Sequence, residues 1–226
     1  MKKIWVGVFF LLIINLSCKK ENSNNKPVFH RALILGNSIT IHPPLPSIGW
    51  FGNWGMAASS KDKDFVHILS STLRIPVEPV NLSEWEALTS KFDLTKLDQY
   101  FISKPDLIII RLGENINGTT DLKTALQSLI SYIKSHNNNA KLLVTGRFWK
   151  NDDIDAVLSI VAKENNIPFV KLNHLEIGEN VSSLGASVMG EDSQSHQVTN
   201  QGVANHPGDL GMKRIAECIL TEINNF

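Results

Sequence analysis

The chain has 226 residues, 22 of them Lys or Arg and 22 Asp or Glu, and 42% of its residues are hydrophobic. This length and composition fit one α/β domain with a sizeable core. A net charge of zero argues against nucleic acid or an anionic surface as the main partner, because both bind proteins through a basic face. The sequence shows no internal repeat and no cysteine cluster of the zinc-binding type.

The N-terminal segment reads as a targeting signal rather than as part of the fold. An apolar run over residues 4–16 follows two lysines; it is too short to span a bilayer but has the length of a signal-peptide core. Its end, Asn-Leu-Ser before Cys18, resembles a bacterial lipobox, although Asn15 replaces the usual aliphatic residue. The resemblance implies a lipoprotein-type signal peptide over 1–17, then a lipidated cysteine with a polar tether over 18–29. It also implies a lipid-anchored place in the bacterial cell envelope, on its periplasmic or cell-surface face. The alternative is an ordinary signal peptide with a coincidental cysteine.

Apolar strands and amphipathic helices alternate through residues 30–226. An unbroken apolar run predicts a strand buried on both faces, and apolar residues three or four positions apart predict a helix packed on one side. The predicted strands span 31–36, 77–82, 106–113, 141–145 and 168–172, and the predicted helices span 65–72, 92–101, 122–133, 154–162 and 212–223. Five such alternations predict a three-layer α/β/α domain on a central parallel five-stranded sheet, with helices on both faces because the crossovers are right-handed.

Two long segments of this domain show no strong periodicity. A Pro, Gly and Trp-rich loop follows the first strand over 41–60, and Ser60 or Asp62 is available after it to cap the first helix. Residues 173–207 form a second loop, and a loop of that length in a compact domain is usually functional. Cys218 lies in a helical pattern, so a buried free thiol is expected there.

Polar residues follow or precede three element junctions that a parallel sheet would bring to one edge. Ser38 follows the first strand, Asn115 follows the strand over 106–113, and His206 precedes the last helix. Ligands of open parallel sheets bind beyond the carboxyl ends of the strands. A serine, a histidine and an amide are the minimum set for acyl transfer, in which the histidine takes the serine proton, the serine attacks and the amide holds the oxyanion. Each residue alone also fits an ordinary turn or helix cap, and their order along the chain is what favours a site.

At these junctions the chain resembles the SGNH (GDSL-like) hydrolase family, over roughly residues 30–226. Segment 36–38 (Gly-Asn-Ser) matches the G-D-S block of the family, and segment 113–115 (Gly-Glu-Asn) matches its G-x-N block. Segment 206–212 matches its last block, in which a histidine precedes Pro, a small residue, Asp and Gly. The resemblance implies a flavodoxin-like α/β/α sandwich that acts as an esterase, lipase or carbohydrate deacetylase without metal or cofactor.

The resemblance also implies a role for each matching residue. Ser38 would be the nucleophile, His206 the general base and then acid, and Asn115 the side-chain oxyanion donor. The backbone N–H groups of Ser38 and Ser83 would complete the oxyanion hole, although the family has a glycine where Ser83 stands. Asn37 replaces the family's aspartate, whose side chain organises the turn rather than reacting.

The largest departure from the family is the acid that orients the histidine. The family has an aspartate three residues before the histidine, and Val203 occupies that position here. An imidazole still needs a partner that fixes its tautomer and stabilises its charged form. We expect the backbone carbonyl near Val203 to do so, which gives a Ser–His dyad; a carboxylate from Glu86, Glu191 or Asp192 is the alternative. Losing the acid can cost about four orders of magnitude in rate, so a weak or inactive carbohydrate-binding protein on the same scaffold is the alternative function.

Charged and aromatic residues near the predicted strand ends are candidates for substrate contacts. Arg111 interrupts an aliphatic strand, where a charge must either pair, for instance with Glu114 or Glu86, or face the site. Trp50 and Trp54 lie in the loop after the first strand, where they can stack on sugar rings or pack over the core. The expected partner is therefore a small ester or an acylated saccharide, with a membrane contacted only through the lipid anchor. The seven histidines show no metal-ligand spacing, so no metal is expected.

Overall fold

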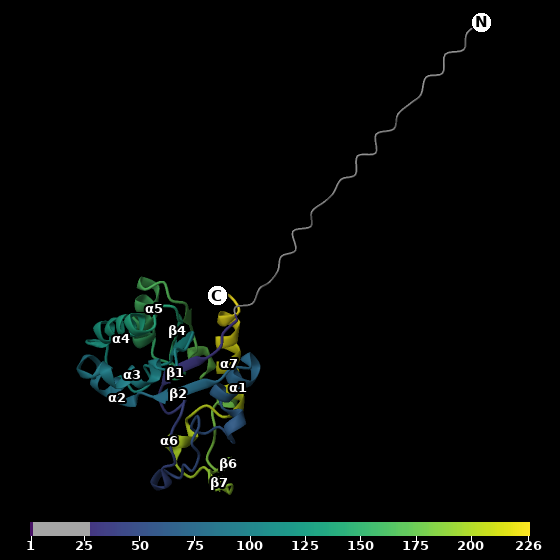
Figure 1. Cartoon of the computed structure of the whole chain (residues 1–226). Helices are drawn as coiled ribbons and strands as arrows, with labels where there is room; N and C mark the ends of the chain where they lie inside the picture. The colour runs from purple at the N-terminus through teal and green to yellow at the C-terminus, as the bar shows by residue number, and fades with distance from the viewer. Residues whose placement is uncertain (2–27) are drawn as a thin grey trace.

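The computed structural model of the chain describes residue 1 and residues 28–226 (Figure 1). The predicted signal peptide (1–17), Cys18 and most of the tether lie outside the described residues. Within the described part, five parallel strands form one sheet in the order β2-β1-β3-β4-β5. They are β1 (Ala32–Gly36), β2 (Val77–Asn81), β3 (Leu107–Ile110), β4 (Lys141–Thr145) and β5 (Phe169–Val170). This is the flavodoxin-like order, and the predicted parallel five-stranded sheet is confirmed.

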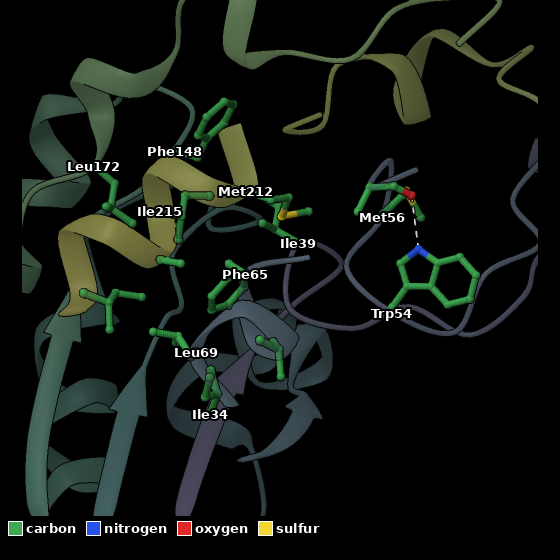
Figure 2. Close-up of a cluster of buried hydrophobic side chains, with 14 of the residues drawn as sticks. Ile34, Ile39, Trp54, Met56, Phe65, Leu69, Phe148, Leu172, Met212 and Ile215 are labelled. Carbon is green, nitrogen blue, oxygen red and sulfur yellow. Dashed lines mark hydrogen bonds between the residues drawn. The ribbon is translucent and has the colours of Figure 1, made fainter. Parts of the chain in front are cut away.

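Helices cover both faces of the sheet, because successive residues of a buried strand point to opposite faces. On one face, Ile34 and Ile109 pack against α1 (Phe65–Leu73) and α7 (Asp209–Ile223). Figure 2 shows side chains of both helices meeting over Ile34. Full burial of one such aliphatic side chain stabilises the fold by roughly 1.5–3 kcal/mol, so this cluster is a main source of stability.

The opposite face of the sheet carries the second hydrophobic cluster. Leu35 and Ile110, which alternate with the residues of the first face, point into it. The helices that cover this face are α2 (Ser83–Leu88), α3 (Asp98–Phe101), α4 (Leu122–His136) and α5 (Asp152–Glu164). The predicted three-layer α/β/α arrangement is therefore confirmed.

One local prediction between α1 and α3 is wrong, and another is correct only in part. The cap of α1 is Asp64, whose carboxylate accepts the His67 N–H at 2.7 Å, rather than Ser60 or Asp62. The predicted helix over 92–101 is helical only from Leu94, as one 3-10 helix (Leu94–Leu97) continued by the single turn of α3. The short helix α2 precedes these turns and was not predicted, because six residues are too few to show a periodic apolar face.

The long segment 173–207 contains short elements that lie beyond the carboxyl ends of the strands, whereas the C terminus lies at the other end of the sheet (Figure 1). A hairpin pairs β6 (Ser187–Met189) with β7 (Ser195–Gln197), and the one-turn helix α6 (Gln201–Ala204) follows. None of the helices in the described residues has the length and apolar composition that crossing a bilayer requires.

Backbone hydrogen bonds join this hairpin to the loop over 41–60. The Met189 N–H donates to the Ser59 carbonyl at 2.8 Å, and the Glu191 N–H donates to the Phe51 carbonyl at 2.9 Å. The two segments, far apart in sequence, therefore form one surface beyond the carboxyl ends of the strands.

Candidate active site

Ser38 lies just beyond the carboxyl end of β1, where the strand order of the sheet reverses. β1 pairs with β2 on one side and with β3 on the other, so segments leaving β1 and β3 diverge around this point. The turn requires glycine at position 36, because a Cβ there would collide with the side chain of Thr40. Such reversal points are where open α/β sheets bind their ligands.

Ser38 and His206 are in hydrogen-bond contact, although they are far apart in sequence. Ser38 Oγ lies 2.9 Å from Nε2 of His206, and Nδ1 of the same ring lies 2.7 Å from the backbone oxygen of Gly202. Because a carbonyl oxygen can only accept, Nδ1 carries the proton and Nε2 presents its lone pair to Ser38. The imidazole is therefore in the tautomer that can take a proton from the serine.

The carbonyl that orients the ring belongs to Gly202, one residue before the predicted Val203. The Val203 carbonyl instead accepts the backbone N–H of His206 at 3.0 Å. Asn200 caps α6, with its side-chain oxygen accepting the Gly202 N–H at 2.7 Å. The turn of α6 therefore fixes where the orienting carbonyl points, and the expectation for Val203 is corrected.

No carboxylate within the described residues contacts the imidazole of His206. Both ring nitrogens already have partners, Ser38 Oγ and the Gly202 carbonyl. Of the predicted alternatives, Asp192 binds the His196 ring at 2.9 Å, and Glu191 is exposed in the hairpin. Glu86 is buried below Asn115. The expectation that one of these three residues orients the ring is wrong.

Burial keeps the imidazole of His206 neutral. The residue is 8% exposed, and the ring of Trp149 packs edge-on against it with centroids 5.0 Å apart. Burial lowers the pKa of His206 from 6.5 to about 4, and the hydrogen bond to the Gly202 carbonyl opposes this only in part. At neutral pH the ring is therefore unprotonated and able to act as a base.

Ser38 and Asn115 offer hydrogen-bond donors in a cavity of about 340 Å³ that also contains His206. No acceptor for the Ser38 backbone N–H lies among the described residues. Asn115 Nδ2 donates one of its two N–H groups to Glu86 at 2.5 Å, so the second N–H group is available to a ligand. Ser83 also lines this cavity, but its N–H donates to Asn81 Oδ1 at 3.0 Å, so the expected third oxyanion donor is not free.

The buried carboxylate of Glu86 holds three groups next to the cavity around Ser38 in place through hydrogen bonds. Glu86 is 2% exposed and lies on α2. It accepts hydrogen bonds from Asn37 Nδ2 at 3.0 Å, from the Gly113 N–H at 2.5 Å and from Asn115 Nδ2 at 2.5 Å. Gly113 has a φ of +126°, a conformation that only glycine adopts readily. One buried carboxylate thus connects the turn before Ser38 with the segment that carries Asn115.

Arg111 and Glu114 form a buried ion pair under the site. Their side chains are each 1% exposed and meet at 2.9 Å. Arg111 also donates to Asn37 Oδ1 at 3.1 Å, and Glu114 accepts the Phe148 N–H at 2.7 Å. The expected substrate contacts of Arg111 and Glu114 are therefore wrong, and the alternative of a buried pair is correct.

Trp50 and Trp54 are core residues of the loop over 41–60. They are 0% and 5% exposed and pack edge to face, with ring centroids 5.8 Å apart. Figure 2 shows the indole N–H of Trp54 donating within its own loop. Of the two alternatives for these tryptophans, packing over the core is correct and stacking on a sugar ring is not. The aromatic residue that reaches the site is Trp149, which follows β4 and donates its indole N–H to the Asn205 carbonyl at 3.0 Å.

Across residues 28–226, no three His, Cys, Asp or Glu side chains lie close enough together to hold a metal ion.

Comparison of the sequence with protein-family models and with curated proteins finds no match. Comparison of the structure with solved structures finds esterases and lipases of the GDSL-like type. A protein from Bacteroides ovatus described as a GDSL-like lipase has a TM-score of 0.57 at 14% identity, over 88% of this chain and 100% of that one.

Two esterases also share the fold. A family two carbohydrate esterase from Clostridium thermocellum, solved with cellohexaose, has a TM-score of 0.53 at 17% identity, over 88% of this chain and 65% of that one. A two-domain esterase active on acetylated mannans, crystallised with mannopentaose, has a TM-score of 0.56 at 16% identity, over 87% of this chain and 50% of that one. This chain thus spans between half and two thirds of the length of these two proteins, and it has the fold of the GDSL-like esterases.

Proposed function

We propose that the chain is a serine esterase that removes a small acyl group, such as acetate, from a carbohydrate or similar ester. The observation that carries the proposal is the 2.9 Å contact between Ser38 Oγ and His206 Nε2, in a cavity that Asn115 also lines. The substrates of the compared proteins support a saccharide ester, since one is active on acetylated mannans and another was solved with cellohexaose.

The first half of the reaction forms an acyl-enzyme. His206 Nε2 takes the proton of Ser38 Oγ while that oxygen bonds to the carbonyl carbon of the ester. The carbonyl oxygen becomes an oxyanion, and the Ser38 N–H and the free proton of Asn115 Nδ2 hold it. The carbon–oxygen bond to the alcohol then breaks, and the protonated His206 gives its proton to the departing alcohol oxygen.

The second half of the reaction repeats these steps with water. His206 takes a proton from water, the water oxygen attacks the acyl carbon, and the oxyanion forms again between the same donors. The bond to Ser38 Oγ breaks as His206 returns the proton to that oxygen, and the free acid leaves.

The dimensions of the site favour a short acyl group. The cavity around Ser38 has a volume of about 340 Å³, near the lower end of the 300–1,000 Å³ typical of small-molecule sites.

The partner of His206 Nδ1 is a carbonyl dipole and not a full negative charge, so it stabilises the imidazolium less than a carboxylate would. We therefore expect a slower enzyme than one with a complete triad.

We also propose that Cys18 is lipidated and anchors the domain in the bacterial cell envelope. The folded domain is described from residue 28 onward, and Phe29 packs against Phe226 with ring centroids 6.1 Å apart, at the end of the sheet opposite Ser38 (Figure 1). A tether that leaves the domain there would hold the active site away from the membrane. Incorporation of labelled palmitate in the bacterial host should be lost in Cys18→Ser, and equal incorporation by both proteins would contradict the anchor.

The enzymatic proposal is tested by hydrolysis of p-nitrophenyl acetate and of acetylated manno-oligosaccharides. Ser38→Ala and His206→Ala should each abolish turnover, whereas Ser71→Ala, an exposed serine on α1, should not change it. Oligosaccharide binding without turnover in the wild type would instead support the non-catalytic binding protein.

A further inference from the structure

A second cavity of about 580 Å³ adjoins the cavity around Ser38. Ile48 and Asn200 line both cavities, so the two share a boundary. We call the second one the hairpin cavity. Its lining residues are Pro46, Ser47, Ile48, Gly49, Phe51, Ser195, His196, Gln197, Thr199 and Asn200.

The walls of the hairpin cavity are held in place before any ligand binds. One wall is the 3-10 turn Pro46–Ile48, and the other is the chain from β7 to Asn200. The two walls are in close contact at Gly49 and Thr199, where a Cβ on Gly49 would lie only 2.7 Å from Thr199 Oγ1. The hydrogen bond from the Glu191 N–H to the Phe51 carbonyl joins the hairpin that carries one wall to the loop that carries the other. A site formed in advance loses less conformational entropy on binding.

The lining of the hairpin cavity is neutral and rich in hydroxyl and amide groups. Of its residues, none is Lys, Arg, Asp or Glu. The side chains of Ser47, Gln197 and Thr199 have no hydrogen-bond partner among the described residues, so their polar atoms are available to a ligand. An anionic ligand would find no lysine or arginine here, and a long acyl chain would face mostly polar groups.

An aromatic pair adds to the apolar lining that Pro46 and Ile48 provide. The rings of Phe51 and His196 stack with centroids 3.8 Å apart and planes 9° apart. Nε2 of the same His196 ring lies 2.9 Å from the carboxylate of Asp192. A flat apolar surface beside several hydroxyl and amide groups suits a ligand with apolar ring faces and many hydroxyl groups.

We propose that the hairpin cavity binds the saccharide part of the ester, as a subsite for an uncharged sugar unit next to the acylated one. This inference rests on the proposed esterase function, because the acyl group must lie at Ser38 while the sugar extends past Ile48 and Asn200. The subsite discriminates between acylated oligosaccharides and simple esters, since a small alcohol leaving group does not reach it.

The test compares kcat/KM for acetylated manno-oligosaccharides with kcat/KM for p-nitrophenyl acetate. Gln197→Ala should lower the ratio of the two about fivefold, the effect of one lost hydrogen bond. Thr199→Trp, which fills the cavity, should lower the ratio at least tenfold. Gln194→Ala is the matched control, because this glutamine lies in the same hairpin but does not line the cavity. A ratio that stays unchanged in both cavity variants, while the wild type hydrolyses both esters, would overturn the subsite and leave the esterase proposal standing.

Two further measurements separate the subsite from the esterase proposal and from an acyl-chain cavity. Calorimetry of the Ser38→Ala protein with mannopentaose should detect binding that Thr199→Trp removes, and this readout needs no turnover. Mannopentaose binding that Thr199→Trp leaves intact would contradict the subsite. Thr199→Trp should affect p-nitrophenyl octanoate no more than p-nitrophenyl acetate, and a selective loss with octanoate would assign the cavity to acyl chains instead.

Discussion

Asn115 Nδ2 donates to the carboxylate of Glu86 at 2.5 Å, and the same carboxylate accepts the side chain of Asn37 at 3.0 Å. The proposed oxyanion donor Asn115 and the turn that precedes Ser38 therefore share one buried anchor. Donors that are held in place before the reaction need no reorganisation when the oxyanion forms, and this is the largest single contribution in many acyl-transfer enzymes.

Glu86→Gln is expected to lower kcat with little change in KM. A glutamine side chain has one acceptor oxygen and adds two N–H donors, so at least one N–H group now bound to Glu86 loses its acceptor. Asn115→Ala should lower kcat by about 10²–10³, as for other single oxyanion donors, and Glu86→Gln should approach this value. The Glu86→Gln/Asn115→Ala double variant should lose less activity than the product of the two single effects.

The control for Glu86 lies on the same helix. Glu84→Gln changes an exposed side chain that pairs with Lys96, and it should leave kcat unchanged. If the effects of Glu86→Gln and Asn115→Ala on kcat simply multiply, Glu86 does not act through Asn115 and the positioning role is wrong.

The pH profile reports the environment of His206. Because burial lowers its pKa to about 4, the acid limb of kcat/KM for p-nitrophenyl acetate should fall near pH 4 rather than near 6.5. The unfolded chain binds this proton below about pH 6.5 and the folded chain only below about pH 4, so protonation favours unfolding between these values. Protonation of His206 therefore leaves the free energy of unfolding unchanged above pH 6.5, and it lowers this free energy as the pH falls from 6.5 toward 4. An acid limb near 6.5 would contradict the buried, neutral imidazole.

Trp149 is expected to control this acid limb. Its ring covers the imidazole of His206 edge-on at a centroid distance of 5.0 Å. Trp149→Ala should admit water, raise the pKa of His206 and move the acid limb to higher pH. Trp149→Phe keeps an aromatic cover and loses only the hydrogen bond to the Asn205 carbonyl, so its limb should stay closer to that of the wild type. Coincident limbs in all three proteins would show that Trp149 does not shield the ring.

The buried pair of Arg111 and Glu114 is expected to matter for stability. Glu114→Ala leaves the Arg111 guanidinium without its carboxylate in a place where the side chain is 1% exposed, so the free energy of unfolding should fall by roughly 3–5 kcal/mol. Urea denaturation measures this change. Glu84→Ala, which breaks the exposed pair with Lys96, should have a much smaller effect. Similar losses in the two variants would contradict the structural role of the buried pair.

The sheet and its order of elements were predictable because the strands are continuous apolar runs. Ile108, Ile109 and Ile110 are all fully buried, and a short β-branched run without polar alternation is typical of a strand covered on both faces. The positions of Ser38, Asn115 and His206 followed from the same topology, since each lies at an element end that a parallel sheet brings to one edge.

The partners of these residues were not predictable in the same way. The carbonyl that holds His206 belongs to Gly202 because α6 turns there, and backbone carbonyls carry no mark in the sequence. The sequence offered Glu86 as a partner of the histidine or of Arg111, but not as the anchor of Asn115, because six residues are too few to predict the helix α2 and its orientation. Trp50 and Trp54 resemble exposed loop aromatics in the sequence, and only their burial in the loop shows otherwise.

The central claim is that Ser38 is a nucleophile activated by His206, and reaction with a fluorophosphonate probe tests it most directly. The wild-type protein should be labelled on Ser38 with one probe per chain, labelling should be absent in Ser38→Ala, and it should be strongly slowed in His206→Ala. Equal labelling of the wild type and Ser38→Ala would contradict the account, as would a wild-type protein that does not react at all.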